Sequence, residues 1–343
     1  MASRVPETSK PASAESALLS VRNLRTHFAT PAGTVKAVDD VSFDLGRDDI
    51  LAIVGESGSG KSVTALSIMK LVPTPPGRYV SGRAIIDGID LMTLRARDLV
   101  GVRGAKLAMI FQNPRAALNP SFTVRAQLVE TLRRHDRESS KIQTEQRMLK
   151  MMRSVGFSDP ERVAQSYPHH LSGGMCQRIG LALAFACDPA VLIADEPTTA
   201  LDVVVQARIL HLLGRVHRER RLPILIITHD FGVVRAIANR VIVMYAGKIQ
   251  ETGSVDQILT SPQHPYTRAL IASVPDPERT AAGFYQIRGQ PPDLLRLPRG
   301  CKFADRCDYV MPICRSVEAG MSPSPSGSSV RCHMFPQAGE QAA

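Results

Sequence analysis

The stretch Gly55-Glu56-Ser57-Gly58-Ser59-Gly60-Lys61-Ser62 follows the apolar run 50–54 and precedes a segment, 63–71, that continues as a helix. It fits the pattern G-x-x-x-x-G-K-[S/T] in the strand, loop and helix context that this pattern requires. Glycines let such a loop wrap a phosphate, and its backbone N–H groups with the helix N-terminus attract anions. We therefore expect Lys61 to contact the β- and γ-phosphates of a nucleotide and Ser62 to offer its hydroxyl to Mg²⁺. The alternative is a Gly/Ser turn that binds no ligand.

Composition places the chain among globular proteins larger than one ordinary core. It has 343 residues, 44% of them hydrophobic, and a formal net charge of +10. No apolar span approaches the roughly 20 residues of a membrane helix. Residues 1–16 are rich in Ser, Ala and Pro without the apolar core of a secretory signal, so we expect a disordered tail and a cytoplasmic protein. The basic residues are spread along the chain and there is no Trp, which disfavours a nucleic-acid surface.

Three further apolar runs end in polar side chains. The run 107–111 ends at Gln112, 191–194 ends at Asp195 and Glu196, and 223–228 ends at His229. Open α/β sheets bind ligands at the carboxyl ends of their parallel strands. We expect Asp195 to organise Mg²⁺, Glu196 to deprotonate a water molecule, and His229 to contact the γ-phosphate or that water. Gln112 either projects its amide towards a metal or water, or merely ends its strand.

The remaining pattern predicts two additional layers. The alternating segments 18–28 and 35–45 predict an antiparallel β-layer, in which Phe28 either stacks on adenine or packs in the core. Residues 121–167 show helical spacing and high charge, which predicts an inserted helical lobe. Ser172-Gly173-Gly174 precedes a long helix and forms a second anion-binding arrangement, whose phosphate could be held by another subunit. The turn 199–202 ends in Asp202, which caps the helix 203–219.

Together these residues resemble the nucleotide-binding subunits of ATP-binding cassette (ABC) transporters. In that family's order and spacing, 55–62 is similar to the Walker A motif, Gln112 to the Q-loop and 171–175 to the signature. Residues 191–196 resemble Walker B with its catalytic glutamate, 199–202 the D-loop, and His229 the switch histidine. Met175 stands where many members have Gln, and oligopeptide importers often carry Met there.

The resemblance implies an α/β fold with a P-loop NTPase core, an antiparallel β-subdomain and an α-helical subdomain at about 113–185, all within a domain at 17–260. It implies a head-to-tail dimer that encloses two ATP molecules, with Ser172, Gly173, Gly174 and Asp202 acting in trans. Phe28 would stack on adenine, and Ser62, Gln112 and Asp195 would hold Mg²⁺. The implied catalytic residues are Glu196, His229 and Gln112.

The tail resembles the dipeptide and oligopeptide importer branch of this family. Residues 264–270 (HPYTRAL), 291–292 and 300–307 carry that similarity, which implies a C-terminal extension at 261–343. Its cysteines, Cys301, Cys307, Cys314 and Cys332, lack the paired C-x₂-C spacing of a typical zinc site. We expect them to hold a [4Fe–4S] cluster, with a structural Zn²⁺ or free thiols as the alternatives, and a bound metal would staple this small segment.

The branch further implies a peripheral ATPase on the cytoplasmic face of a bacterial inner membrane. Its partners would be a second nucleotide-binding subunit, identical or paralogous, two permease subunits and an extracytoplasmic solute-binding protein. Peptides are the expected cargo, and the alternatives are nickel complexes, opines or another small solute. A soluble ABC ATPase acting on DNA or ribosomes is a rival, although this chain has one cassette and a short helical lobe. A non-hydrolysing regulatory subunit would have lost Glu196 or His229, and both are present.

Overall fold

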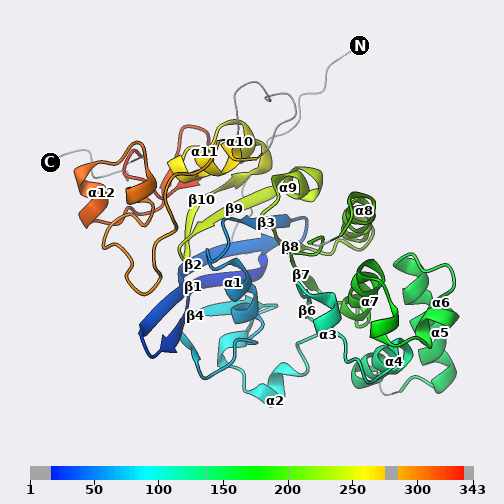
Figure 1. Cartoon of the computed structure of the whole chain (residues 1–343). Coiled ribbons are helices and arrows are strands. Elements are labelled where there is room, and N and C mark those ends of the chain that lie inside the picture. Colours follow the sequence, from blue (N-terminus) through cyan, green and yellow to red (C-terminus); the bar gives the residue numbers. More distant parts are fainter. Residues whose placement is uncertain (1–16, 137, 200, 275–284, 336–343) are drawn as a thin grey trace, which may run out of the picture.

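The computed structural model describes residues 17–136, 138–199, 201–274 and 285–335. The expected disordered tail at 1–16 lies outside these ranges. Two sheets form the centre of the molecule, with helices on both sides (Figure 1). The strands are β1 (Ala17–Thr30), β2 (Gly33–Gly46), β3 (Ile50–Val54), β4 (Gly77–Ile86), β5 (Ile89–Asp90), β6 (Leu107–Ile110), β7 (Val191–Asp195), β8 (Ile224–Ile227), β9 (Arg240–Tyr245), β10 (Lys248–Ser254), β11 (Ser322–Pro323) and β12 (Ser329–Val330).

The larger sheet has the strand order β11-β12-β10-β9-β3-β8-β7-β6. Strands β6, β7, β8, β3 and β9 run parallel, and β10 returns antiparallel to β9. Every residue of β3, β7 and β8 is buried, as expected for parallel strands covered on both faces. Because the side chains alternate, Ile50 and Ala52 join the hydrophobic core on one face while Leu51 and Ile53 join the core on the other.

The smaller sheet, of order β2-β1-β4-β5, is antiparallel throughout. It confirms the antiparallel layer that the alternation at 18–28 and 35–45 predicts. Its inward residues, such as Leu19 and Val38, share a core with Leu51 of the central sheet and with Ile68 of α1 (Lys61–Ile68). The first helix after the phosphate-loop sequence is therefore held between two sheets, which fixes the position of its N-terminus.

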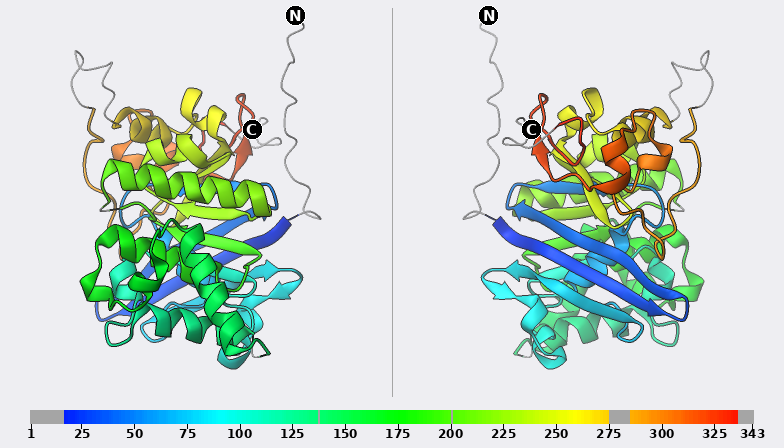
Figure 2. Two further views of the ribbon diagram at one scale, coloured as in Figure 1. Left: turned by 90° about the vertical axis from the view of Figure 1, so that its right-hand side faces the viewer. Right: turned by 90° about the vertical axis from the view of Figure 1, so that its left-hand side faces the viewer.

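A helical lobe packs on the other core. Thr123 and Ser140 cap α4 (Val124–His135) and α5 (Lys141–Ser154) through their hydroxyls, and Met148 and Met152 of α5 are fully buried. Figures 1 and 2 show this green lobe at the opposite end of the molecule from the orange and red C-terminal segment. The lobe contains α3 (Pro114–Ala117), α4 (Val124–His135), α5 (Lys141–Ser154), α6 (Pro160–Ala164), η3 (Pro168–His170) and α7 (Gly173–Phe185).

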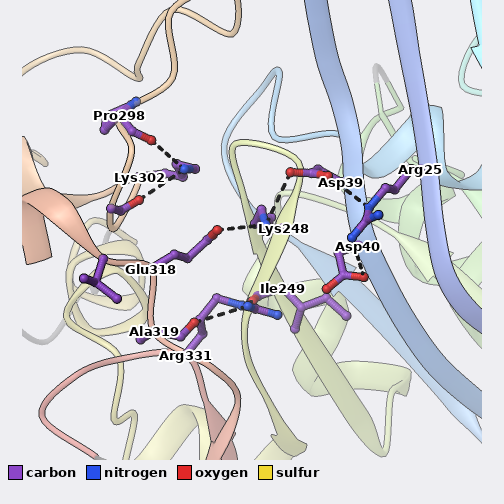
Figure 3. Close-up of polar contacts among 12 residues, drawn as sticks. Arg25, Asp39, Asp40, Lys248, Ile249, Pro298, Lys302, Glu318, Ala319 and Arg331 are labelled. Atoms are coloured by element: carbon purple, nitrogen blue, oxygen red, sulfur yellow. Dashed lines mark hydrogen bonds and ion pairs between the residues drawn. The ribbon is translucent and has the colours of Figure 1, made fainter. Parts of the chain in front are cut away.

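The C-terminal segment is built onto the central sheet, because β12 pairs with β10. A buried Lys248 on β10 joins the two parts: its ammonium lies 3.3 Å from Asp39 on β2 and 3.0 Å from Glu318 in the extension (Figure 3). Arg331 adds hydrogen bonds to the carbonyls of Ile249 and Ala319. The other elements are η2 (Leu91–Thr93), α2 (Ala96–Leu99), α8 (Val203–Arg220), α9 (Phe231–Ile237), α10 (Val255–Thr260), α11 (Pro265–Ala272), η5 (Ala304–Arg306) and α12 (Pro312–Ser316).

Within the described ranges, no helix combines the length and the apolar character needed to cross a membrane.

Candidate active site

The loop between β3 and α1 depends on glycine at two positions. Gly55 has φ +152° and Gly60 has φ +101°, both in the region that favours glycine. A Cβ at Gly55 would collide with the carbonyl oxygen of Met244, and one at Gly60 with that of Ala37. The backbone of the loop therefore passes too close to β9 and β2 for any larger residue. The loop presents its backbone N–H groups at the start of α1, which suits an anion.

Lys61 is folded into this loop. Its ammonium is buried and donates to the carbonyl oxygens of Gly55 and Glu56, each at 2.8 Å. Burial lowers the pKa of Lys61, while the carboxylates of Glu196, Asp195 and Glu56 act to raise it. The positive charge of the lysine thus lies inside the loop, where it would meet the phosphates of a nucleotide.

Ser62 and Asp195 form the oxygen-rich part of the site. Ser62 Oγ, in the first turn of α1, donates to Asp195 Oδ1 at the end of β7, with 3.0 Å between them. Burial raises the pKa of Asp195 to about 6, and the charge of Glu196 adds to this, while Ser62 and Lys61 act in the opposite direction. A hydroxyl and a carboxylate are ligands that Mg²⁺ prefers, and the charge of the cation would favour the ionised carboxylate. The donor set therefore fits magnesium.

Glu196 is the centre of a second polar group. Gln112 Nε2 and Thr199 Oγ1 both donate to its Oε2 at 2.8 Å, and His229 Nδ1 lies 3.2 Å from its Oε1. Burial acts to raise the pKa of Glu196, but the hydrogen bonds from Thr199, His229 and Gln112 together lower it below its ordinary value. Glu196 therefore stays a carboxylate, which is the form that accepts a proton from water.

The backbone at Glu196 is unusual as well, with φ +46°. Its N–H donates to the carbonyl of Ile227 at 2.9 Å, which fixes the residue against β8. Left-handed backbone in a residue with a side chain costs about 1 kcal/mol or more, and such strain gathers at functional sites. The structure thus brings together Gln112, Glu196 and His229, which the sequence placed at three separate strand ends.

Thr199 is the member of this group that sequence reasoning missed. The sequence places it in a turn that resembles the D-loop and predicts no contact with Glu196. In the structure its hydroxyl donates to the carboxylate of Glu196 and its N–H donates to the Glu196 carbonyl. A Thr three residues after a strand-end acid in a turn is a recognisable signal, because this spacing returns the hydroxyl to the acid.

The residues expected to act in trans lie apart from the loop. Ser172 caps α7 by accepting the N–H of Met175, and a Cβ at Gly173 would meet open space. Figure 1 shows α7 in the helical lobe, away from α1. Asp202 caps α8 by accepting the N–H of Val205. The next two residues, Val203 and Val204, have 81% and 60% of their surfaces exposed.

Phe28 lies on β1, opposite Val35 of β2 and Gly77 of β4. Its ring is half-buried and packs on the Gly77 position. Stacking on adenine therefore remains a prediction for this residue.

The four tail cysteines converge. None of the six cysteines is part of a disulfide. Cys301, Cys307, Cys314 and Cys332 line one cavity of about 20 Å³, and burial with the charges of the other three raises the pKa of Cys301 to about 11. His264 lines the same cavity, and its buried Nε2 has no hydrogen-bond partner among the described residues. Among those residues, however, no three His, Cys, Asp or Glu side chains are arranged to hold a metal ion.

The class of protein follows from three features: the loop, the pair Ser62 and Asp195, and the group around Glu196. Together they define a P-loop nucleoside triphosphatase of the ATP-binding cassette type. The comparisons agree. Residues 38–199 match the family model "ABC transporter", and residues 250–314 match "Oligopeptide/dipeptide transporter, C-terminal region".

The dipeptide transport ATP-binding protein DppD of Bacillus subtilis (strain 168) is 47% identical over 325 residues, covering 95% of this chain and 97% of the relative. The oligopeptide transport ATP-binding protein OppD of Salmonella typhimurium (strain LT2) is 45% identical, covering 87% of this chain and 88% of the relative. A dimeric ATP-binding cassette solved in a post-hydrolysis state with ADP and Pi superimposes with a TM-score of 0.63 and 27% identity, covering 69% of this chain and 98% of that one. The chain belongs to the family of ATP-binding subunits of dipeptide and oligopeptide ABC transporters, and it is an ATPase.

Proposed function

We propose that this chain powers the import of dipeptides or oligopeptides through separate permease subunits, by binding and hydrolysing ATP at an interface with a second nucleotide-binding subunit. The observation that carries the chemistry is the convergence of Gln112, Thr199 and His229 on the carboxylate of Glu196. The C-terminal match and the names of the relatives support the cargo.

In the proposed reaction the loop binds the phosphates, with Lys61 exchanging its carbonyl partners for phosphate oxygens. Ser62, Asp195 and the Gln112 amide would hold Mg²⁺, which would supply positive charge beside the phosphates. Glu196 orients a water molecule and takes its proton while the water oxygen bonds the γ-phosphorus and the bond to the ADP oxygen breaks. His229, bonded to the same carboxylate, orients Glu196 and faces the γ-phosphate. The products are ADP and inorganic phosphate.

The dimer completes the site in this proposal. Ser172, Gly173 and Gly174 lie at a helix N-terminus in the lobe, apart from the loop of their own chain (Figure 1). The adjacent exposed side chains of Val203 and Val204, next to Asp202, suit burial against a second subunit. The related cassette solved with ADP and Pi is dimeric. Each ATP would thus lie between the loop of one subunit and Ser172 of the other.

Replacing Glu196 by Gln tests the catalytic assignment. The amide keeps the shape but cannot accept a proton, so ATP binding should persist while turnover falls at least about a hundredfold and a closed dimer accumulates. Glu145→Gln, which changes a carboxylate on α5, is the matched control. Undiminished turnover in Glu196→Gln would remove Glu196 from its role.

A pull-down from membranes tests the partners and the cargo. Two permeases should co-purify with the full chain, and peptides should stimulate ATP hydrolysis by the reconstituted complex. Stimulation by a nickel complex or an opine in place of peptides would reassign the cargo. Recovery of nucleic acid without permeases would overturn the transporter assignment.

We also propose that the four tail thiols hold a [4Fe–4S] cluster, with Zn²⁺ as the alternative. The shared cavity supports a bound group there, and so does the buried Nε2 of His264, which has no hydrogen-bond partner in the described part of the chain. The cavity, about 20 Å³, has room for little more than one water molecule, so the cysteine-bearing loops must move to admit a cluster. Protein purified without oxygen should contain about four iron and four sulfide per chain. Stoichiometric zinc in a colourless protein would decide for the alternative.

A further inference from the structure

Two residues of the C-terminal extension form hydrogen bonds with the phosphate-binding loop. The N–H of Glu56 donates to the hydroxyl of Tyr266 at 2.9 Å, and the carboxylate of Glu56 receives two hydrogen bonds from Arg306, at 2.7 and 3.0 Å. We propose that Tyr266 and Arg306 are positioning residues of the ATP site, which set the loop in its binding conformation by holding Glu56 on both its backbone and its side chain. The inference rests on the proposed role of 55–62 as the nucleotide-binding loop.

The two side chains that hold Glu56 are buried. Tyr266 is fully buried, and the side chain of Arg306 is 6% exposed. Arg306 also donates to the hydroxyl of Tyr245 at 3.1 Å, and the rings of Tyr245, Tyr266 and Phe303 pack together with centroids 4.6 to 5.4 Å apart. An exposed ion pair contributes little because both side chains move freely, but here the Arg306 side chain is buried and the Glu56 side chain is only 22% exposed.

Glu56 also hydrogen-bonds Lys61, so holding Glu56 in place helps to position Lys61. The carbonyl oxygen of Glu56 accepts the ammonium of Lys61 at 2.8 Å and the N–H of Ser59 at 3.2 Å. The residue that the extension holds is therefore the same residue that orients the phosphate-binding lysine. The charge of Arg306 also offsets that of Glu56, which would otherwise repel the phosphates of the nucleotide.

The two residues that bond Glu56, Tyr266 and Arg306, come from different parts of the extension. Tyr266 lies in the first turn of α11, and Arg306 ends η5. Between them they join positions 210 and 250 residues away from Glu56 in sequence. His264, two residues before Tyr266, lines the cysteine cavity. One short motif thus lines the cysteine cavity with its histidine and hydrogen-bonds the loop with its tyrosine.

The extension has independent attachments to the core. Lys248 bridges Asp39 and Glu318, and β12 pairs with β10 (Figure 3). Removing the single oxygen of Tyr266 or the guanidinium of Arg306 therefore leaves the extension in place. The effects of such changes should consequently appear at the loop.

The test measures ATP binding and steady-state kinetics of the full chain carrying Tyr266→Phe or Arg306→Ala. We expect the KM for ATP to rise roughly two- to tenfold in Tyr266→Phe, the loss of one hydrogen bond, and further in Arg306→Ala, with a smaller change in kcat. Arg315→Ala is the matched control, because Arg315 pairs with Asp305 in the same segment but both side chains are more than half exposed. It should leave KM unchanged.

A double-mutant cycle with Glu56→Gln identifies the route. If Arg306 acts through Glu56, Arg306→Ala should raise KM less in the Glu56→Gln background than in the wild type. Additive effects, or KM changes in both variants no larger than in Arg315→Ala, would overturn the inference. If Arg306→Ala does not fold, Tyr266→Phe decides alone.

Lys61→Ala separates this inference from the proposed function. ATP binding that survives in Lys61→Ala would show that the loop assignment itself is wrong. Loss of binding in Lys61→Ala together with an unchanged KM in Tyr266→Phe and Arg306→Ala would refute only the positioning role.

Discussion

Asp195 should be a residue that lowers the stability of the protein at neutral pH while serving its activity. Its carboxyl is 4% exposed, and burial raises its pKa from 3.8 to about 6. A raised pKa means that the folded chain holds the proton of Asp195 more tightly than the unfolded chain does. The free energy of unfolding therefore falls as pH rises from about 4 to about 6, and the full cost is present above that range.

The size of the effect follows from the shift. A change of this magnitude corresponds to about 3 kcal/mol of unfolding free energy, which is a large part of the stability of an ordinary domain. Asp195→Asn keeps an oxygen to accept the hydroxyl of Ser62 but carries no charge. We expect the variant to be more stable than the wild type at pH 7.5 by up to about 3 kcal/mol, and to be inactive because it loses the proposed magnesium ligand.

Urea unfolding of the two proteins in EDTA, without nucleotide, at several pH values measures the difference. The advantage of Asp195→Asn should shrink towards zero by about pH 4, and excess Mg²⁺ and ATP should restore the stability of the wild type alone. Asp305→Asn, on an exposed side chain, is the control and should change little. A variant no more stable than the wild type at pH 7.5, or an advantage that does not depend on pH, would refute the reasoning.

Three other substitutions probe separate features. Thr199→Val removes a hydrogen bond that lowers the pKa of Glu196. The value of kcat should therefore fall roughly two- to tenfold, and the acid limb of the pH–rate profile should move to higher pH. An acid limb that does not move would contradict this prediction. Gly60→Ala places a Cβ against the carbonyl of Ala37, at a backbone φ of +101° that disfavours alanine. The change should abolish ATP binding and lower the free energy of unfolding by at least about 1–2 kcal/mol, measured by thermal unfolding. Normal ATP binding would show that the loop can relax. Lys248→Met removes the cation that pairs with Glu318 and leaves Asp39 with Arg25 as its partner. The change should cost about 2 kcal/mol and speed proteolysis of the extension, whereas equal rates of cleavage would argue against a tether.

The sequence predicted the phosphate-loop context and the positions of the strand-end residues well, because both are local. The strand 50–54, the glycines and Lys61 are contiguous, and the apolar runs before Gln112, Glu196 and His229 mark where buried parallel strands end. The carboxyl ends of parallel strands must share one edge of a sheet, so their meeting follows from topology.

Contacts that depend on distant segments could not be predicted in this way. Nothing in the pattern around Glu56 indicates that its partners are Tyr266 and Arg306, more than 200 residues later. The two-residue strand Ser329–Val330 is too short to show alternation, and its pairing with β10 is visible only in the structure. The direction of the pKa of Glu196 likewise depends on three hydrogen bonds from three separate segments.

The short strands β11 and β12 also cover a sheet edge to which another chain could otherwise pair. Without β12, the backbone of β10 would present an open row of N–H and C=O groups, a template on which another chain could add a strand. The strand that ends this side of the sheet in the described structure, β11, is two residues long and contains Pro323, which cannot donate a hydrogen bond. A chain truncated before residue 322 would therefore expose a sheet edge, and we expect it to self-associate where the full chain stays dispersed.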